Sequence, residues 1–587
     1  MRLLDALPLL SLFVVSVIGS QQPLKFEDDP ETLYYSLPNE IRRVAVIGAG
    51  PAGLVFTSTL IKYGFEVRMF ERSPNPGGVW HYTERVPIPV SFPNRPIETM
   101  AYIPDIPDHL PATRMYEDGD DGLSVDWRIS EHWEPSPLWK NMMTTEPHQI
   151  MSLPDTTHPK NKPWKLPQMD INRHVRQYAS SVGLNSNDEE HANVTSYWTR
   201  VERVEKLPGT EKRWTVTLRK LTPLRDGKLE VNWWQEQFDA IVVGKSSEND
   251  AAWVPPIPGL NEWATALPDV LFHSRQYRHP EAFSNKNVLI VGGGFSGVGI
   301  ANDLVGHAAS VTVSTRQNSS NPLVPAIRGM FHKNITLIEE VKQFDNRPST
   351  SVKNLGDASL ALSNGTSVAG FDIIMLATGH RDSMPFLVGY HNSTIKGREE
   401  PETDIAPIIT DGTHLRSLHW TGHYINDPTL LMCTSGAWRG SAAVYQALGA
   451  ARVWSRTARL PSTARMWKAY PGAAHLLQEL PILGQTKVRL FVTWLNNEIL
   501  EFGGPLVSEP PFDEMLELIQ YYVNKQYAKE LSGFFKGYIP AQRPRHEWGV
   551  YNGDDGELPL QPYTHQQLKE AHGDRFPEHW AEPSLRW

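Results

Sequence analysis

Cysteine is nearly missing from this chain of 587 residues, which contains only Cys433. A single thiol cannot form an internal disulfide, so we expect the folded state to depend on its hydrophobic core. The absence of a Cys-x-x-Cys pair also removes support for a disulfide reductase. Cys433 stands in the apolar run Thr429–Thr434, which predicts a strand, and we expect the thiol to pack as a small hydrophobic group.

Long basic runs, metal-ligand clusters and hydrolase motifs are also missing. The chain has 56 Lys and Arg against 66 Asp and Glu, a net charge of -10, so no nucleic-acid partner is expected. No group of His and Cys has the spacing of a metal site, and no G-x-S-x-G elbow is present. The mean hydropathy of -0.39 is that of a globular protein, and the length allows about three or four domains.

Long apolar runs are scarce, and the one that stands out lies at the N-terminus. Met1-Arg2 gives a basic start, Ala6–Ile18 is almost wholly apolar, and Gly19 or Ser20 supplies a small residue for cleavage. This pattern predicts a secretory signal peptide over residues 1–20. An uncleaved anchor is the alternative, although a membrane span needs about 20 apolar residues, and we expect no stable span.

Five sequons for N-glycosylation agree with a secretory leader. Together they predict N-glycans and a location in the secretory pathway: secreted, in the lumen of the endoplasmic reticulum, or in a vesicle. The five acceptor residues are Asn193, Asn318, Asn334, Asn364 and Asn392.

The segment Arg43–Glu71 follows the order strand, glycine turn, helix, strand, acid. Apolar runs over Val44–Ile47 and Phe65–Phe70 predict buried parallel strands, and the periodic stretch Leu54–Tyr63 predicts the helix. Such a unit binds a dinucleotide, because its glycines let the pyrophosphate approach the helix N-terminus and its acid accepts ribose hydroxyls. The binding residues predicted here are Gly48, Gly50, Pro51, Ala52, Gly53 and Glu71.

A second unit repeats this pattern later in the chain. Asn287–Val291 predicts a strand, Val298–Val305 a helix and Ser310–Val313 the next strand. The binding residues predicted in its turn are Gly292, Gly294, Ser296 and Gly297.

The second unit ends on Arg316 where the first unit has an acid. An acid favours the free 2′-hydroxyl of NAD, whereas a guanidinium can pair with the 2′-phosphate of NADPH. Arg316 therefore predicts an NADPH site. A solvated surface arginine is the alternative interpretation.

The residues after Glu71 point to a family. A Rossmann acid followed by Gly-Gly-x-Trp resembles the flavin-containing monooxygenase family, which includes Baeyer–Villiger and N-hydroxylating relatives. In that family the paired glycines approach the flavin, so the resemblance implies FAD in the first unit and NADPH in the second. It extends over about residues 40–465. The matching residues are Gly77, Gly78, Val79 and Trp80.

Two further stretches resemble family motifs and supply candidate catalytic residues. Trp139–Pro147 is similar to Tyr-Lys-x-Leu-x-Thr-Asn-x-Pro, but the family's active-site Asn falls on Thr145. The signature His-x-x-x-Tyr or Phe, with Trp in Baeyer–Villiger members, matches His273 and Tyr277, while its leading Phe and Gly are absent. A loop histidine and a packed tyrosine are the alternative.

Thr145 has a consequence for the expected chemistry. In the resembling family an Asn amide helps to hold the oxygen adduct of the reduced flavin, and a hydroxyl offers fewer hydrogen bonds on a shorter stem. We therefore expect competent flavin reduction and a less protected reaction with dioxygen.

The last family-like stretches lie where the chain returns to the flavin unit. Phe371–Leu376 predicts a strand that runs into Ala-Thr-Gly, and Tyr445–Arg456 predicts the final helix of that unit. The resemblance assigns cofactor binding to Thr378, Gly379 and Gln446.

The predicted fold is α/β, with two Rossmann-like dinucleotide-binding domains of which the second is inserted into the first. The Pro-rich stretch 81–137 is expected to be irregular, either a surface excursion or a substrate lid. The predicted division is a signal peptide at 1–20, FAD-binding parts at 40–255 and 371–465, an NADPH-binding domain at 256–370, and a helical extension at 466–587.

Three functions remain open. The resemblance implies an FAD-dependent, NADPH-consuming monooxygenase that inserts one atom of dioxygen into a small organic substrate, similar to fungal members of secondary-metabolite biosynthesis. The second is a flavin oxidase or dehydrogenase, which Thr145 favours, or a Baeyer–Villiger-type enzyme. The third is a flavin-binding, non-enzymatic subunit of a secreted complex.

Overall fold

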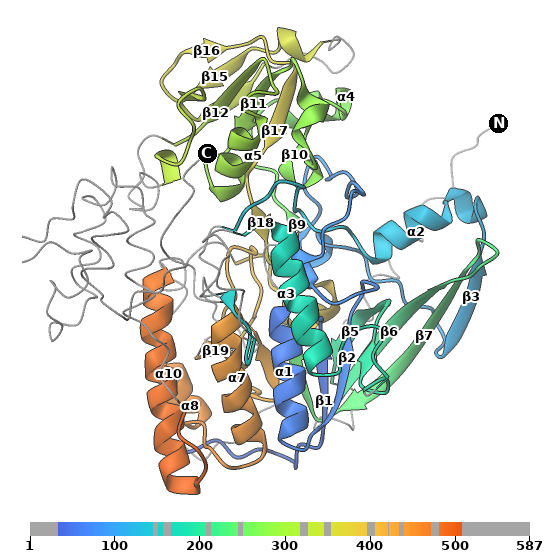
Figure 1. Ribbon diagram of the computed structural model, residues 1–587, viewed down its shortest axis with the longest axis vertical. Helices are drawn as coiled ribbons and strands as arrows, with labels where there is room; N and C mark the ends of the chain where they lie inside the picture. The colour runs from blue at the N-terminus through green and yellow to red at the C-terminus, as the bar shows by residue number, and fades with distance from the viewer. Residues whose placement is uncertain are drawn as a thin grey trace, which may run out of the picture.

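Two parallel sheets form the centres of two α/β units in the computed structural model (Figure 1), which confirms the predicted fold class. The predicted signal peptide lies outside the described residues. These are residues 33–144, 151–156, 166–189, 191–206, 213–244, 251–316, 327–345, 354–395, 406–420, 422–433, 439–470 and 481–507.

The first unit is built on a seven-stranded sheet in the order β19-β20-β21-β8-β1-β2-β4. The strands from β21 to β4 are parallel, and β20 and β19 add an antiparallel edge. The bounds are β1 Arg43–Ile47, β2 Glu66–Phe70, β4 Thr195–Ser196, β8 Ala240–Val243, β19 Leu418–His419, β20 His423–Tyr424 and β21 Leu430–Met432.

Both faces of this sheet are buried, which explains the unbroken apolar run in its sequence. Val44 and Val46 face a core that also holds side chains of α1 (Pro51–Lys62), α3 (Gln168–Ser181) and α7 (Arg439–Trp454), helices seen side by side in Figure 1. Ala45 and Ile47 face the opposite core, shared with an antiparallel sheet.

That antiparallel sheet has four strands in the order β3-β7-β6-β5. The stretch 81–137, expected to be irregular, contributes β3 and the helix α2. The residues of β3 are mostly exposed and show no apolar alternation, and the strand forms because it pairs with β7 over five residues. The bounds are β3 Ala112–Tyr116, α2 Val125–His132, β5 Thr199–Glu205, β6 Trp214–Pro223 and β7 Leu229–Phe238.

The second unit is built on five parallel strands in the order β10-β17-β11-β12-β13. The helix α5 packs on one face, while α4 and a small antiparallel sheet, β14-β15-β16, pack on the other. The bounds are α4 Leu260–Ala266, β10 Leu271–His273, β11 Asn287–Val291, α5 Phe295–Leu304, β12 Ser310–Ser314, β13 Thr336–Ile338, β14 Val341–Phe344, β15 Leu360–Leu362, β16 Ser367–Val368 and β17 Ile373–Leu376.

The position of β17 corrects one predicted boundary. Residues from 371 onward were expected in the flavin unit, but β17 pairs with β10 and β11 in the second sheet. A strand buried on both faces has the same apolar pattern in either sheet, so the pattern could not decide between them. The second unit therefore extends to Leu376.

Two crossings connect the units. The first passes through β9 (Ala251–Ala252) and the second through β18 (His380–Arg381), and these strands pair antiparallel. The amide of Trp253 donates to the carbonyl of Gly379 at 2.9 Å, and the hydroxyl of Thr378 donates to the carbonyl of Trp253. The two crossings are thus tied to each other.

The described part of the predicted C-terminal extension is helical. Helix α8 spans Thr463–Ala469, and α10, Pro481–Phe502, buries Phe491, Leu495 and Ile499 beside α7. Among the described residues, no helix combines the length and the apolar character that a bilayer crossing requires.

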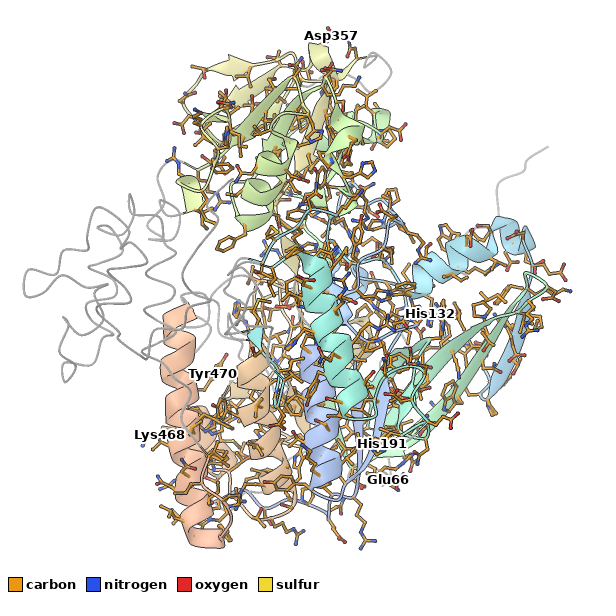
Figure 2. All side chains as sticks on the ribbon, viewed as in Figure 1. Glu66, His132, His191, Asp357, Lys468 and Tyr470 are labelled. Atoms are coloured by element: carbon orange, nitrogen blue, oxygen red, sulfur yellow. The ribbon has the colours of Figure 1, made fainter. Side chains whose placement is uncertain are left out.

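Four histidines, His132, His273, His419 and His423, are buried, and His81 and His380 are half-buried. Burial is the main cause of each lowered pKa: to about 4 for His81 and His423, to about 3 for His380 and His419, and well below the usual value for His132 and His273. Figure 2 shows His132 between α2 and the four-stranded sheet. These side chains are neutral at pH 7.

This burial predicts a protein that loses stability in mild acid. Below about pH 6.5 the unfolded chain binds protons at these histidines and the folded chain does not, so each contributes a loss of about 1.4 kcal/mol per pH unit. The urea midpoint, followed by tryptophan fluorescence, should be constant above pH 7.5 and fall steeply from pH 6.5 to 4.5. His419→Gln should reduce the slope. A midpoint that is flat or rises over this range would contradict the prediction.

Candidate active site

The first glycine turn joins β1 to α1 in a form that only glycine can adopt. Gly48 has a φ of +100°, and its amide donates to the carbonyl of Phe70 at 2.7 Å. A Cβ on Gly53 would lie 1.9 Å from the carbonyl oxygen of Gly48. Helix and strand therefore touch backbone to backbone.

The turn exposes the start of α1 to a ligand. The helix begins at Pro51, three residues before the predicted start, with Gly50 as its N-cap. Pro51 has no N–H, and the amides of Ala52 and Gly53 have no acceptor within the helix. These groups and the positive end of the helix dipole suit an anion such as a pyrophosphate.

The paired glycines, predicted to approach the flavin, lie against this turn. The amide of Gly77 donates to the carbonyl of Ala49 at 3.0 Å, and a Cβ on Gly78 would lie 2.8 Å from the Cα of Gly50. A short 3₁₀ helix then runs over Gly78–Trp80 and includes Val79. The carbonyl of Trp80 accepts a hydrogen bond from the side-chain amide of Asn172 on α3 at 2.7 Å.

Glu71 is buried, with 7% of its surface exposed, and it fixes the turn. One carboxylate oxygen accepts from the amide of Ala49 at 2.7 Å and the other from the amide of Ser73 at 2.8 Å. A carboxylate has about four acceptor sites, so these bonds leave capacity for ribose hydroxyls. Sequence reasoning predicted the ribose role and missed the bond to Ala49.

The second glycine turn repeats the first. Gly292 has a φ of +117°, its amide donates to the carbonyl of Ser314 at 3.0 Å, and a Cβ on Gly297 would lie 2.1 Å from its carbonyl oxygen. Gly294 and Ser296 are exposed at the start of α5, and within the described part of the chain no non-neighbouring atom lies within 4 Å of a Cβ built on Gly294. This helix N-terminus is therefore open to a ligand.

Each turn lies beside a strand that leads into the crossings. A Cβ on Gly48 would lie 3.0 Å from the carbonyl oxygen of Gly244, which follows β8, and a Cβ on Gly292 would lie 2.3 Å from that of Ala377, which follows β17. Ala377 leads through Thr378 and Gly379 into β18, which pairs with β9. We call β9, β18 and residues 377–379 the junction of the two units, and the second turn lies beside it.

His273 ends β10 at this junction. Its Nδ1 accepts from the amide of Arg275 at 3.2 Å, and its ring centre is 5.5 Å from that of His380. Arg275 is buried and pairs with Glu134 at 2.7 Å. Burial, then the neighbouring His380 and Arg275, lower the pKa of His273, which keeps the ring neutral.

Tyr277 lies apart from His273, within the core under α5. It is 1% exposed, packs against Trp139 and Phe283, and donates to a carboxylate oxygen of Asp303 at 2.7 Å. Burial, followed by the charge of Asp303, raises the pKa of its hydroxyl. The structure thus gives Tyr277 a packing partner and a hydrogen-bond acceptor, and a catalytic role stays a prediction.

Thr145 lies outside the described residues, but the stretch before it is anchored on the second unit. Trp139 lies so close to α5 that a Cβ on Gly299 would approach it to 2.7 Å, and Asn141 donates to Asp303 at 3.0 Å. Thr144 is buried, and its amide donates to the carbonyl of Leu166 at 2.9 Å.

Gln446 and Cys433 lie together where α7 passes the sheet. The thiol is buried, as expected, and lies 3.5 Å from the side-chain oxygen of Gln446. Burial raises the pKa of the thiol to about 12, so it is not a reactive thiolate at neutral pH.

Arg316 follows β12 with 78% of its side chain exposed, and its Nε lies 3.3 Å from Glu340. The neighbouring Thr315 approaches the second glycine turn, since a Cβ on Gly293 would lie 2.6 Å from its methyl group. Sequence reasoning selected Arg316 and missed Glu340, because the carboxylate comes from the end of another strand.

A cavity of about 530 Å³ lies between α2, the four-stranded sheet and residues 88–105. Its lining includes Ala252 of the first crossing and Arg275, and no described residue of either glycine turn. The stretch 81–137 therefore builds much of the wall of a cavity of ligand-binding size, which its composition did not indicate.

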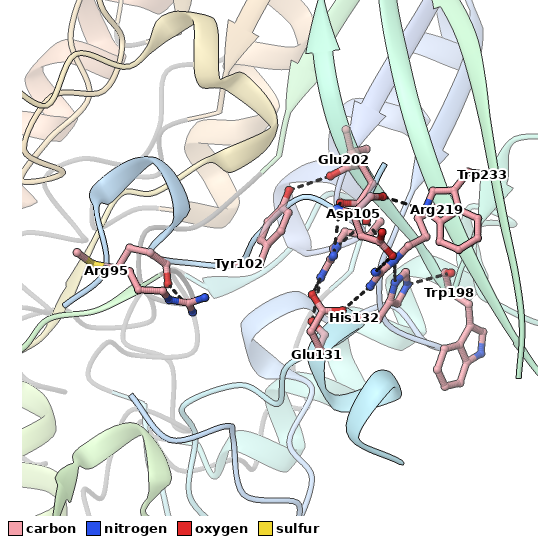
Figure 3. A network of polar contacts seen from close by, with 12 residues as sticks. Arg95, Tyr102, Asp105, Glu131, His132, Trp198, Glu202, Arg219 and Trp233 are labelled. Carbon is pink, nitrogen blue, oxygen red and sulfur yellow. Dashed lines mark hydrogen bonds and ion pairs between the residues drawn. The ribbon is translucent and has the colours of Figure 1, made fainter. Parts of the chain in front are cut away.

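A buried ionic network forms the floor of this cavity (Figure 3). Arg219 on β6 binds Asp105 at 2.9 Å, Glu131 at 2.6 Å and Glu202 at 3.2 Å. Arg200 pairs with the same Glu131 and Glu202. Burial alone would raise the pKa of Glu131, but the two arginines outweigh it and lower that pKa, so the carboxylate stays ionised.

The network also determines which ring nitrogen of His132 carries the proton. The Nε of Arg219 donates to its Nδ1 at 3.2 Å, so the other ring nitrogen carries the proton and donates to the carbonyl of Trp198 at 3.1 Å. Residues from α2, from β6 and from the 100–105 segment are thereby held in one arrangement. Breaking a buried ion pair of this kind costs about 3–5 kcal/mol, so loss of either arginine would destabilise the fold around the cavity.

Comparison with known proteins agrees with this geometry. Residues 110–324 match the model of the flavin-binding monooxygenase-like family, 258–408 that of pyridine nucleotide-disulphide oxidoreductases, and 46–118 that of the NAD(P)-binding Rossmann-like domain. Among solved structures, the S-allyl-L-cysteine S-oxygenase of Allium sativum covers 91% of this chain and 98% of its own, with a TM-score of 0.54 and 21% identity. That likeness concerns the fold.

Curated relatives extend the match over most of the chain. The flavin-containing monooxygenase ustF2 of Aspergillus flavus is 29% identical over 77% of this chain and 92% of its own. The flavin-containing monooxygenase iboF of Amanita muscaria is 35% identical over 80% of this chain and 91% of its own. The chain belongs to the flavin-containing monooxygenase family, whose cofactors are FAD and NADPH.

Proposed function

We propose that this protein is an FAD-dependent monooxygenase that consumes NADPH and inserts one atom of dioxygen into a small organic substrate. The observation that carries the proposal is that each glycine turn lies beside the strand that precedes a crossing, and that the two crossings pair with each other. Two dinucleotides held at one junction can present their reactive rings to each other.

The residues of both turns fit the cofactors. Glycine leaves open the space that a Cβ would fill, and the first amides of α1 and α5, which have no acceptor within their helices, suit a pyrophosphate. We assign FAD to the first turn, where Glu71 is placed for ribose hydroxyls and Gly77-Gly78 lies beside Gly50. We assign NADPH to the second turn, where Arg316 is placed for the 2′-phosphate.

When bound, NADPH supplies a hydride and the flavin activates dioxygen. The two turns would hold the two dinucleotides. His273 and His380 lie beside each other at the crossings and are neutral at pH 7, so neither of them is an imidazolium acid there. Thr145, which stands where the family has Asn, is the residue we expect to limit how well the oxygenating step is protected.

The cavity beside Arg275 supports the proposal that the substrate is a small organic molecule. Its volume of about 530 Å³ lies within the range of small-molecule sites, and Arg275 is two residues from His273. Likeness to fungal family members supports a place in secondary-metabolite biosynthesis. An oxidase or dehydrogenase, favoured by Thr145, is the second candidate function, and a Baeyer–Villiger enzyme or a non-enzymatic flavin subunit would be revealed by the products of the assay below.

We further propose that the protein enters the secretory pathway and carries N-glycans. The N-terminal leader pattern and the sequons support this. Among the described acceptors, Asn193, Asn334 and Asn364 are exposed, as glycosylation requires.

Gly53→Ala and Gly297→Ala should separate the two cofactor sites. Each new Cβ meets a backbone oxygen at about 2 Å and must displace the turn. We expect Gly53→Ala to be purified without flavin absorbance and Gly297→Ala to stay yellow but to lose binding of adenosine 2′,5′-bisphosphate in calorimetry. Each variant is the control for the other, and the reverse pattern would overturn the assignment.

Oxygen insertion is tested with ¹⁸O₂, NADPH and a panel of small amines, thioethers and cyclic ketones, because a Baeyer–Villiger enzyme would convert the ketones into lactones. We expect a product that carries one ¹⁸O, with hydrogen peroxide as a side product. Consumption of NADPH with peroxide alone, at a rate that no member of the panel changes, would favour an oxidase, and a flavin that NADPH does not reduce would favour a non-enzymatic role.

Thr145→Asn should improve this coupling. One well-placed hydrogen bond is worth about 0.5–1.5 kcal/mol, equivalent to a change of about twofold to tenfold. We expect the peroxide formed per NADPH to fall by such a factor in Thr145→Asn and not in Thr145→Ala. Equal coupling in wild type and Thr145→Asn would remove the role given to Thr145.

A further inference from the structure

The carboxyl ends of β12 and β13 bring a second charged group next to Arg316. The two strands are parallel, with Ser314 opposite Ile338, so Arg316 and Glu340 each stand two residues beyond one edge of the sheet. The amide of Thr315 donates to the carbonyl of Ile338 at 3.0 Å, and the hydroxyl of Ser314 donates to that of Glu339 at 3.0 Å. The positions of both segments are therefore fixed by backbone contacts.

Glu340 lies between two cations at this edge. Its carboxylate is 3.3 Å from the Nε of Arg316 and 2.6 Å from the Nζ of Lys342. The hydrogen bond from Lys342 is the main cause of a lowered pKa at Glu340, so the carboxylate is ionised at neutral pH. Arg316, Glu340 and Lys342 therefore form a row in which a carboxylate lies between two cations.

The row lies where the adenosine ribose of a dinucleotide is bound in this type of fold. Such ligands bind beyond the carboxyl ends of the strands, and the group that reads the 2′ position follows the second strand of the unit. Thr315, which precedes Arg316, lies against the glycine turn at Gly293. The same edge therefore carries groups suited to a phosphate and a group suited to a hydroxyl.

Arg316 and Lys342 are exposed and Glu340 is partly exposed, so these ion pairs contribute little to folding and can be exchanged for a ligand. A 2′-phosphate has about twice the charge of a carboxylate and can accept from both the guanidinium and the ammonium. A carboxylate close to that phosphate repels it. A free 2′-hydroxyl, in contrast, can donate to Glu340 as it does to the acid of NAD-binding units.

We propose that Lys342 and Glu340 set the coenzyme preference of the second site. Lys342 and Arg316 together bind the 2′-phosphate of NADPH. Glu340 repels that phosphate and accepts a hydrogen bond from the 2′-hydroxyl of NADH. This inference rests on the proposed NADPH site, and it adds that the preference for NADPH is held below its maximum by Glu340.

The test is calorimetric binding of adenosine 2′,5′-bisphosphate and of 5′-AMP to the purified flavoprotein. We expect Lys342→Met to weaken binding of the bisphosphate by about fivefold to tenfold and to leave binding of 5′-AMP unchanged. Glu340→Gln should strengthen binding of the bisphosphate by a similar factor. The control is Glu339→Gln, which removes the charge of a neighbouring acid whose carboxylate accepts from the hydroxyl of Ser363 at 3.5 Å, and it should bind as wild type.

Steady-state kinetics give an independent measure. Glu340→Gln should raise the KM for NADH and lower that for NADPH with kcat unchanged, a pattern that loss of packing would not produce. If wild type binds the bisphosphate and both variants bind it equally well, the inference is wrong and the NADPH site stands. If wild type does not bind the bisphosphate, both are wrong.

Discussion

The close approach of helix and strand at the two glycine turns is the constraint on which the structure depends. At Gly53 and Gly297 the nearest atom to an added Cβ would be the carbonyl oxygen of the first glycine of the same turn, at 1.9 and 2.1 Å. Only glycine permits this contact, and the contact places the first amides of α1 and α5 at the carboxyl edge of each sheet. Everything proposed for the cofactors follows from that placement.

The paired crossings fix the two units, and with them the two turns, relative to each other. Because β9 and β18 pair, and because Trp253 is bonded to Thr378 and Gly379, the junction has a defined geometry. Neutral His273 and His380 fill its interior, and Arg275 extends from it to Glu134 and the cavity. The ionic network around Arg219 then holds the cavity floor against the four-stranded sheet. Cofactor junction and cavity are thus parts of one continuous framework.

A feature could be predicted from the sequence when the residues that form it lie close together in the chain. The turns at Gly48–Gly53 and Gly292–Gly297 combine strand, turn and helix within about 30 residues, and their existence, order and α/β class were predictable. The strand β3, the partner of Arg316 and the network of Arg219 depend on residues distant in the chain, for which no local pattern exists. The strand β17 was recognised but placed in the wrong unit, because burial on both faces looks alike in either sheet.

The central claim is that electrons pass from a nucleotide on the second turn to a flavin on the first. Anaerobic mixing of the yellow protein with NADPH in a stopped-flow spectrometer, with protium and then deuterium at C4 of the nicotinamide, tests it most directly. The account predicts that the flavin absorbance bleaches in one turnover and that deuterium slows the bleaching, as direct hydride transfer requires. A flavin that stays oxidised while NADPH is bound at saturation would contradict it.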